Sequence, residues 1–416
     1  MNSEDNLQHF RNNSTQTSSK TMNRRLFSLT STICTVLLSV AAQLNAQTWV
    51  THSTFAGASR TVLIDPSATV TPPAALVGGG AMGGIVAVAS DGSYTLTTGS
   101  GPDSCFRLGL DTSLGGHLFA AGSSGTPGTW VVHESNNGGA NWSLANSFSL
   151  AAKYSCARGF ASDGKGNVFV CGGATDSSGY SHWIVRRRDA SGTWKTVQDI
   201  SIRRSDCYAS AMYIVNGTLF IVGQSGNKWM VQRGSNLGAS SLTWGTPYTW
   251  VPSKTGSAQA NAVTADGAGN IYVFGVNGSA AFGFEAVATS AVLQKSSDLG
   301  NTWVIAATFK PTGSGANRAH DMAFDASGNL FLASAANFSY SPNPTTVVSA
   351  WKWVVYRRDA TTGIWEGAFP SGVDPADGKN SLAKGISTDA KGNVFVTGPV
   401  QDSSGNYVTE VQRLVP

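Results

Sequence analysis

The chain has 416 residues, of which 12% are charged and 48 are glycine, and its formal net charge is +4. Charged residues make up roughly a quarter of an ordinary globular chain, so this composition, rich in Val, Thr and aromatic residues, favours strands and tight turns over helices. No run of Lys or Arg interleaved with aromatic residues occurs, which excludes the usual nucleic-acid-binding surface and a polybasic membrane-binding segment.

The N-terminus has the pattern of an export signal. Arg24 and Arg25 precede an apolar run that ends at Ala42, and small residues before Gln47 offer a cleavage site. The apolar run is shorter than the 18 or so residues that a membrane-spanning helix needs, so we predict cleavage rather than a membrane anchor. We expect residues 1–46 to be a signal peptide, with Met22 as an alternative start, and the protein to be extracellular or periplasmic.

Removal of the signal would leave residues 47–416 as one domain. The signal carries four basic and two acidic residues, so its loss lowers the net charge from +4 to +2. The exported protein is therefore nearly neutral, and we expect a monomer that binds neither nucleic acid nor membranes.

One phrase recurs along the chain at spacings of 48 to 64 residues: Asp-x-x-Gly-Asn followed by three β-forming residues. The Asp and Asn side chains can bond the turn backbone, and Gly accepts a positive φ, so each copy predicts a tight hairpin. Repeats of this length with several strands indicate a β-propeller. The clearest copies begin at Asp163, Asp266, Asp325 and Asp389, and weaker copies begin at Asp65, Asp111 and Asn216.

A second half-phrase follows the hairpins: an aromatic-led strand, a polar turn and another Trp, as in Trp130 and Trp142. The two half-phrases predict an all-β fold of about seven four-stranded blades. The count of seven requires residues 56–102 to be a degenerate first blade, with its third and fourth strands at 84–90 and 93–98. Six blades with a decorated entry segment is the alternative.

The ends of the chain predict how the ring closes. The last repeat stops at Pro416 after its third strand. The segment that begins at Gln47 places Phe55 six residues after Trp49, the same spacing as in the fourth strand of a later repeat. We therefore expect residues 47–55 to complete the last blade and to cover its free edge.

The predicted turn between the third and fourth strands of one repeat carries Ser296, Asp298, Gly300 and Trp303 in the pattern Ser-x-Asp-x-Gly-x-Thr-Trp. This is the Asp-box pattern, and the repeat resembles those of sialidase-type (BNR) propellers and of bacterial seven-bladed propeller proteins. The resemblance implies that the Asp box is a structural turn. A sialidase of that family would also need an Arg-Ile-Pro segment, which this chain lacks, so the resemblance implies the fold more strongly than sialic-acid hydrolysis.

Two other patterns have structural interpretations. The glycines at 78–83 fit a dinucleotide fingerprint, but a strand follows them, so we predict no cofactor. Four cysteines remain after the signal, and we expect them to be buried structural thiols without a metal. A site of converging thiolates is the alternative, and spacing gives no disulfide connectivity. These cysteines are Cys105, Cys156, Cys171 and Cys207.

Side chains that can be positively charged recur four or five residues before the hairpin Asp, at the start of the predicted innermost strands. In a nearly neutral protein they predict a pocket for a carboxylate or sulfate. The alternative is that they pair with Asp103, Asp206 and Asp321. Long loops at 276–290 and 335–350 belong to the same face. The predicted ligand-binding residues are Arg60, Arg107, Arg158, His320, Lys384, Asp206, Glu285 and Tyr340, and Asn261 shares the level of the basic residues.

The sequence thus predicts a secreted propeller that binds a carbohydrate or another extracellular polymer, with an anionic group in the ligand. A glycoside hydrolase of the exo-sialidase kind or a polysaccharide lyase is one alternative, and a protein-interaction scaffold is another. No spacing singles out a catalytic residue, and no His-Glu-x-x-His or Gly-x-Ser-x-Gly motif is present.

Overall fold

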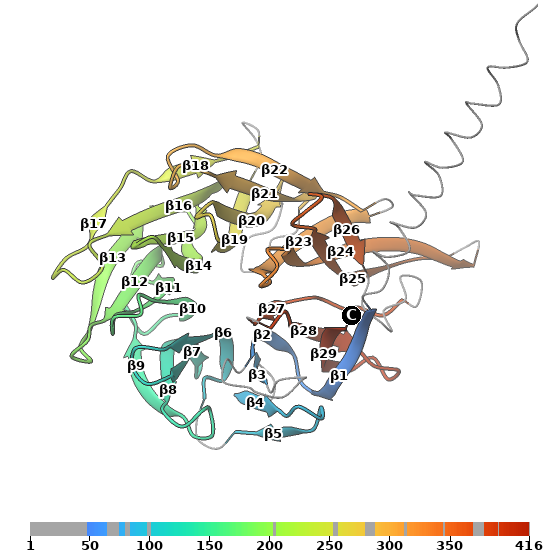
Figure 1. Ribbon diagram of the computed structural model, residues 1–416, viewed down its shortest axis with the longest axis horizontal. Helices are drawn as coiled ribbons and strands as arrows, with labels where there is room; N and C mark the ends of the chain where they lie inside the picture. Colours follow the sequence, from blue (N-terminus) through green and yellow to red (C-terminus); the bar gives the residue numbers. More distant parts are fainter. Residues whose placement is uncertain are drawn as a thin grey trace, which may run out of the picture. The chain divides into compact units, whose positions relative to one another are not determined.

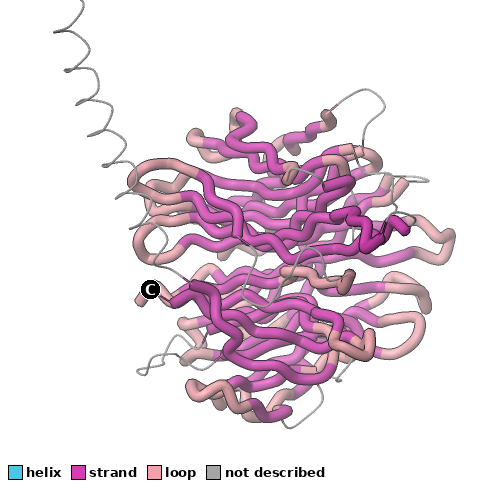
Figure 2. Tube along the Cα trace, turned by 90° about the vertical axis from the view of Figure 1, so that its right-hand side faces the viewer, coloured by secondary structure: helices cyan, strands magenta, loops and turns pink. Residues whose placement is uncertain are grey.

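The computed structural model describes residues 48–64, 75–79, 84–97, 101–202, 205–252, 257–278, 288–311, 314–343, 346–368, 378–389 and 391–415. These residues form strands and turns and contain no helix, so no helix in them is long and apolar enough to cross a membrane. The strands form seven sheets arranged in a ring (Figure 1). In the view of Figure 2 the connecting loops gather at both ends of the strands.

The sheets are the blades of a seven-bladed β-propeller, which confirms the predicted fold. In the fourth blade the outer position is divided between two short strands. From inner to outer strand, the blades are β2 (Ser59–Ile64), β3 (Ala75–Gly79), β4 (Ile85–Val88) and β5 (Tyr94–Leu96); β6 (Ser104–Asp111), β7 (His117–Ser124), β8 (Thr129–Ser135) and β9 (Ser143–Phe148); β10 (Ser155–Ser162), β11 (Val168–Thr175), β12 (Ser181–Arg188) and β13 (Trp194–Ser201); β14 (Cys207–Val215), β15 (Thr218–Ser225), β16 (Lys228–Ser235), β17 (Thr243–Trp244) and β18 (Tyr248–Trp250); β19 (Ala258–Ala265), β20 (Ile271–Asn277), β21 (Ser290–Ser296) and β22 (Val304–Phe309); β23 (Ser314–Phe324), β24 (Leu330–Asn343), β25 (Thr346–Arg358) and β26 (Trp365–Ala368); and β27 (Gly385–Thr388), β28 (Val394–Gln401), β29 (Tyr407–Val415) and β1 (Thr48–Ala56).

The recurring Asp-x-x-Gly-Asn phrase forms the hairpin between the first two strands of a blade. Asp163 Oδ1 accepts hydrogen bonds from the N–H groups of Lys165 (2.8 Å) and Asn167 (3.0 Å), and Asn167 Nδ2 donates to Asp163 Oδ2 (2.6 Å). The same Asn-to-Asp bond recurs in the hairpins that begin at Asp266, Asp325 and Asp389. These carboxylates are therefore occupied by the turns that they hold.

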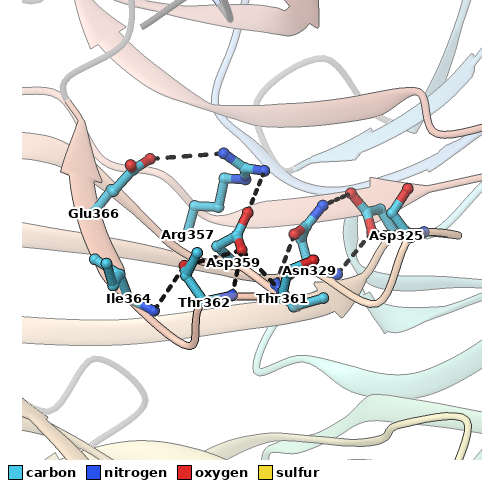
Figure 3. A network of polar contacts seen from close by, with 10 residues as sticks. Asp325, Asn329, Arg357, Asp359, Thr361, Thr362, Ile364 and Glu366 are labelled. Carbon is cyan, nitrogen blue, oxygen red and sulfur yellow. Dashed lines mark hydrogen bonds and ion pairs between the residues drawn. The ribbon is translucent and has the colours of Figure 1, made fainter. Parts of the chain in front are cut away.

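Figure 3 shows how one such hairpin is joined to the next turn of its own blade. Asn329 Oδ1 accepts a hydrogen bond from the N–H of Ala360 (2.9 Å). Arg357 lies between two carboxylates, with Nη2 3.3 Å from Asp359 Oδ2 and Nη1 3.7 Å from Glu366 Oε2. The acidic residues on this face thus serve the turns.

The apolar core lies between the blades. The buried apolar side chains that the structure describes form seven clusters, and each cluster joins two neighbouring blades. Trp130 and Phe119, for example, pack against the third blade. An aromatic residue at the second or third position of the second strand packs in the cluster shared with the following blade. It is present in the second to seventh blades: Phe119, Phe169, Phe220, Tyr272, Phe331 and Phe395.

The first blade is complete, which rules out the six-blade alternative. Its second strand has Leu76 where the other blades have an aromatic residue. A cavity of about 660 Å³ lies beside Leu76, between the first and second blades, and Leu110 and Leu118 also line it.

The predicted closure is confirmed, because β1 is the outer strand of the last blade and lies beside β29 (Figure 1). Thr51 Oγ1 donates a hydrogen bond to Glu410 Oε1 (2.7 Å). Trp49 packs among residues of the sixth and seventh blades, and Phe55 packs between the seventh and the first. One strand from the start of the domain therefore completes two apolar clusters.

The prediction of a loop at 335–350 is wrong. Residues 330–343 and 346–358 instead continue as paired strands, and Tyr340 is opposite Val348. The β-branched residues from Thr346 to Val348 explain the extension, since they favour a pleated conformation. The predicted loop at 276–290 lies mostly outside the described residues, as does Glu285.

We predict that Trp49→Ala lowers the free energy of unfolding by about 3 to 5 kcal/mol, because it empties a site that is 8% exposed between two blades. Equilibrium urea unfolding measures the loss. Val50→Ala, on the same strand but 36% exposed, is the control and should cost less than about 1 kcal/mol. Equal losses for the two variants would contradict a closing role for Trp49.

We also predict that Leu76→Phe raises the free energy of unfolding by about 1 kcal/mol, because it restores the aromatic residue of the other blades beside an existing cavity. Leu219→Phe is the matched control. Leu219 is fully buried in a filled cluster, so the same change should overpack it and cost about 1 to 3 kcal/mol. Thermal unfolding of both variants tests this, and a destabilised Leu76→Phe would show that the cavity cannot take a ring.

Candidate functional site

The innermost strands share a β-bulge near their start. In six blades the pairing with the second strand skips one residue, and that residue lies opposite no partner. In the seventh blade Lys384 holds the equivalent position immediately before β27, and its N–H donates to Thr397 O (2.9 Å). We call these seven residues the bulge ring: Arg60, Phe106, Arg158, Ser210, Asn261, His320 and Lys384.

A small residue on each second strand permits the bulge. At Gly172, an added Cβ would lie 2.0 Å from the carbonyl oxygen of Cys156, and at Gly223 it would lie 2.1 Å from that of Tyr208. In both cases the carbonyl belongs to the residue two before the bulged one. At these two positions only glycine allows the two backbones to approach so closely. The Gly three residues after the second-strand aromatic is therefore a sequence signal for the bulge.

The bulge ring lines one pocket of about 100 Å³ at the centre of the propeller. The bulge takes each of these residues out of the regular alternation of its strand. The pocket contains all six residues predicted at this level. The described residues that line it are Arg60, Phe106, Arg107, Arg158, Ser210, Ala211, Asn261, Ala319, His320, Asp321 and Lys384.

Of the other predicted ligand residues, Asp206 is absent from the described lining of the pocket. Tyr340 lies in the extended part of β24, paired with β25. Glu285 falls outside the described residues. The described lining thus comes from the innermost strands.

Arg107 and Asp321 form an ion pair across the ring. Arg107 Nη1 lies 2.8 Å from Asp321 Oδ2, and the two residues belong to the second and sixth blades. Asp321 also accepts hydrogen bonds from the N–H groups of Met322 (3.0 Å) and Ile386 (3.3 Å). The sequence left open that the basic residues pair with acidic residues instead of binding an anion. For Arg107 this alternative is correct, because Asp321 balances its charge.

Basic side chains predominate in the described lining of the pocket. It contains four cations, those of Arg60, Arg107, Arg158 and Lys384, and one carboxylate, that of Asp321, which pairs with Arg107. Lys384 and Arg158 are each only 9% exposed. Such burial strengthens their interaction with an anion, because little water screens it.

Phe106 separates two of these cations. The guanidinium carbons of Arg60 and Arg158 lie 4.7 and 5.0 Å from its ring centroid, and Arg158 also lies 5.6 Å from the ring of Tyr208. Cation–π contacts of this kind contribute about 0.5 to 2 kcal/mol each. Phe106 therefore helps to hold two like charges beside the pocket. Sequence reasoning missed it by searching for basic residues, although it lies five residues before Asp111 as Arg158 does before Asp163.

His320 is the titratable member of the bulge ring. Partial removal of the ring from water, together with the positive charges of Lys384, Arg318 and Arg60, holds the pKa of His320 well below its usual range. Its Nε2 is buried and has no hydrogen-bond partner among the described residues. At neutral pH the ring is therefore an uncharged imidazole in a cationic pocket.

The cysteines are buried free thiols, as predicted. Burial raises the pKa of Cys105 to about 12 and that of Cys207 to about 11. Burial also raises the pKa values of Cys156 and Cys171. They are therefore protonated at neutral pH, and no cluster of metal-ligating side chains occurs in the described part of the chain.

The Asp-box residues lie at the opposite ends of the strands and hold a turn. Ser296 Oγ donates to Asp298 Oδ1 (2.8 Å) and accepts from Gly300 N (2.8 Å), and Trp303 Nε1 donates to Gly300 O (3.2 Å). Hydrogen bonds from Thr302 lower the pKa of Asp298 to about 2. These contacts are local, and none of the residues lines the central pocket.

No protein-family model matches the chain, and no curated protein matches it either. Solved structures do share its fold. A GH74 xyloglucanase from Xanthomonas campestris is 12% identical, with a TM-score of 0.53 over 85% of this chain and 53% of the other. An α-L-arabinanase from Penicillium chrysogenum is 12% identical, with a TM-score of 0.42 over 74% and 92% of the two chains.

The extracellular domain of a hybrid two-component system from B. thetaiotaomicron is 11% identical, with a TM-score of 0.47. The match covers 86% of this chain but only 38% of that one. At 12% identity the likeness to the xyloglucanase shows the propeller fold and nothing finer, because the same fold carries many functions.

We predict that Arg107→Gln lowers the free energy of unfolding by about 2 kcal/mol, because Asp321, whose side chain is 9% exposed, loses its charged partner. The double variant Arg107→Gln with Asp321→Asn should lose less than the sum of the two single variants, by about 1 kcal/mol or more. A double-mutant cycle in urea measures this coupling. Additive losses would show that the pair contributes nothing to stability.

Proposed function

We propose that this protein is an exported propeller that binds an acidic extracellular carbohydrate through its bulge ring. The observation that carries the proposal is the gathering of four cationic side chains, against one carboxylate, in the described lining of the pocket. The net charge of the whole protein after signal removal is only +2. Such a concentration of one sign attracts an opposite charge and orients it. The resemblance of the repeat to sialidase-type propellers favours a sugar ligand over other anions, and the N-terminal pattern favours export.

The size of the pocket limits what enters it. Its volume of about 100 Å³ equals that of about three water molecules, and small-molecule pockets usually measure about 300 to 1,000 Å³. One carboxylate or sulfate group fits, whereas a whole sugar ring does not. The remainder of the ligand would therefore lie across the mouth of the pocket, against the loops that lead into the innermost strands.

The lining favours binding over hydrolysis. Glycoside hydrolysis ordinarily uses two carboxyl groups on either side of the scissile bond. Asp321 is the single carboxylate in the described lining, and Arg107 and two backbone N–H groups already occupy it. An exo-sialidase-like mechanism therefore has no pair of carboxylates in this part of the site.

A polysaccharide lyase is the second candidate, and His320 is the observation that favours it. A lyase removes a proton beside the carboxylate of a uronic acid, and the neutral imidazole of His320 can accept a proton. The nearby cations would stabilise the charge that develops on the carboxylate. This reaction would release an unsaturated sugar, which binding alone does not.

The test is a glycan screen on the protein purified after export, with acidic and matched neutral glycans, followed by assays for released sugar and unsaturated products. Binding of acidic glycans without product supports the proposed function. An unsaturated product would show that the protein is a lyase, and released sugar would show that it is a hydrolase; either outcome would contradict the proposed binding function. Failure to bind any glycan, together with capture of a protein partner, would favour an interaction scaffold.

We predict that Arg60→Gln with Arg158→Gln weakens binding of an acidic glycan by about 100-fold, because a hydrogen bond to a charged group contributes about 1.5 to 3 kcal/mol. The salt dependence of binding should also decrease. Arg186→Gln is the matched control, since Arg186 stacks on Phe148 at 4.5 Å but does not line the pocket. Unchanged affinity in a folded double variant would contradict the proposed binding site.

A further inference from the structure

A stack of alternating cations and rings joins the innermost strands of the first four blades. The guanidinium carbon of Arg60 lies 4.7 Å from the ring centroid of Phe106, and that of Arg158 lies 5.0 Å from the same centroid. Arg158 in turn lies 5.6 Å from the ring centroid of Tyr208. Each member comes from a different blade. We call these residues the cation–π stack.

Tyr208 differs from the other members because it does not belong to the bulge ring. It lies in β14, two residues before the bulged residue Ser210, and it is absent from the described lining of the pocket. Ser210 does line the pocket but has no ring. Tyr208 would therefore act on a bound ligand through Arg158, rather than by touching the ligand itself.

Tyr208 is held in place at its own end of the stack. It is 5% exposed, and its hydroxyl donates a hydrogen bond to Gln224 Oε1 (2.8 Å). Gln224 Nε2 in turn donates to Gly226 O (2.7 Å). Burial raises the pKa of the Tyr208 hydroxyl, so it remains a donor at neutral pH. The ring thus has a fixed position against which Arg158 packs.

The third blade leaves room for this ring. Gly173 lies on its second strand, and an added Cβ there would lie 3.1 Å from Tyr208 Cβ, which is closer than ordinary van der Waals contact. The absence of a side chain at Gly173 therefore lets β14 bring Tyr208 against the blade to which Arg158 belongs.

We infer that Tyr208 is a positioning residue of the binding site, which fixes the guanidinium group of Arg158 through the cation–π stack. Ordering a long side chain at the moment of binding costs free energy, and a guanidinium that already packs on a ring loses less freedom when a ligand binds. Arg158 has other contacts, among them Tyr154, and the stack need not be its only support. The inference rests on the proposed function, because it requires Arg158 to contact the anionic group of the ligand.

The experiment compares Tyr208→Leu with the parent protein in calorimetric titrations with sodium sulfate and with sodium glucuronate. We expect the variant to bind the anion that the parent prefers about fivefold more weakly, which corresponds to the cost of ordering one arginine side chain. The dependence of affinity on salt concentration should not change, because no charge is removed. Arg60→Gln with Arg158→Gln should instead reduce that dependence.

Tyr272→Leu is the matched control. Tyr272 is 6% exposed, and its hydroxyl donates a hydrogen bond to Asp266 Oδ2 (3.2 Å). Lys295 Nζ lies 5.5 Å from its ring centroid, but Tyr272 is absent from the described lining of the pocket. Loss of this ring should destabilise the protein about as much as loss of Tyr208 and leave anion binding unchanged. Tyr208→Phe keeps the ring of the stack and should bind nearly as tightly as the parent.

A measurement without ligand tests the position of Arg158 directly. In protein with isotope-labelled arginine, nuclear magnetic resonance identifies the Nε–H signal of Arg158 by its absence in Arg158→Gln. The neighbouring rings shift this signal through their ring currents. In Tyr208→Leu the signal should move toward that of an arginine in solvent, and in Tyr272→Leu it should stay in place.

Unchanged anion affinity in Tyr208→Leu, an unmoved Arg158 signal, or an equal loss of affinity in Tyr272→Leu would each overturn the inference. If Tyr208→Leu does not fold, Tyr208→Met keeps most of the side-chain volume without a ring and takes its place. Failure of the parent protein to bind either anion, or binding that survives Arg60→Gln with Arg158→Gln, would contradict the proposed function. The Arg158 signal would then still decide whether Tyr208 positions that side chain.

Discussion

The close approach of two backbones, present at a glycine in all blades but the sixth, is the constraint on which the site depends. A glycine on the second strand lets a carbonyl oxygen of the innermost strand lie where the Cβ of any other residue would clash with it. At Gly172, for example, an added Cβ would lie 2.0 Å from the carbonyl oxygen of Cys156. The sixth blade uses Ser334 instead, whose hydroxyl donates a hydrogen bond to the carbonyl of Arg318. Because this contact recurs around the ring, residues far apart in sequence meet at a single level of the central pocket.

The two faces of the propeller have different physical roles. On the hairpin face, carboxylates and amides are used in turns, and arginines join neighbouring blades. Arg187 donates to the carbonyl groups of Gly238 (3.3 Å) and Ala239 in the next blade, and Arg233 donates to Leu299 O (2.9 Å) in the one after it. Those charges stabilise the ring. The charges around the bulges are instead gathered in a pocket, at a cost in mutual repulsion that stability alone does not require.

Three features make that repulsion tolerable. Phe106 lies between two guanidinium groups, the Arg107–Asp321 pair balances one cation, and His320 stays neutral. Together they let basic side chains from several blades gather at one level of the described pocket lining.

The sequence alone determined the repeat, the hairpins, the closing strand and the level at which basic residues gather, because each depends on local turn chemistry or on a period along one chain. It also placed the degenerate first blade, although Leu76 replaces the usual aromatic residue there. Tertiary structure decided which member of each innermost strand faces the centre. A bulge shifts the alternation by one residue, so Phe106 rather than Arg107 holds the bulge position. The ion pair of Arg107 with Asp321 joins two blades through residues that are 214 positions apart in the sequence. The spacing of residues along the chain does not tell which residues of different blades come into contact across the ring. The pairing of charges in the pocket could therefore be obtained only from the folded structure.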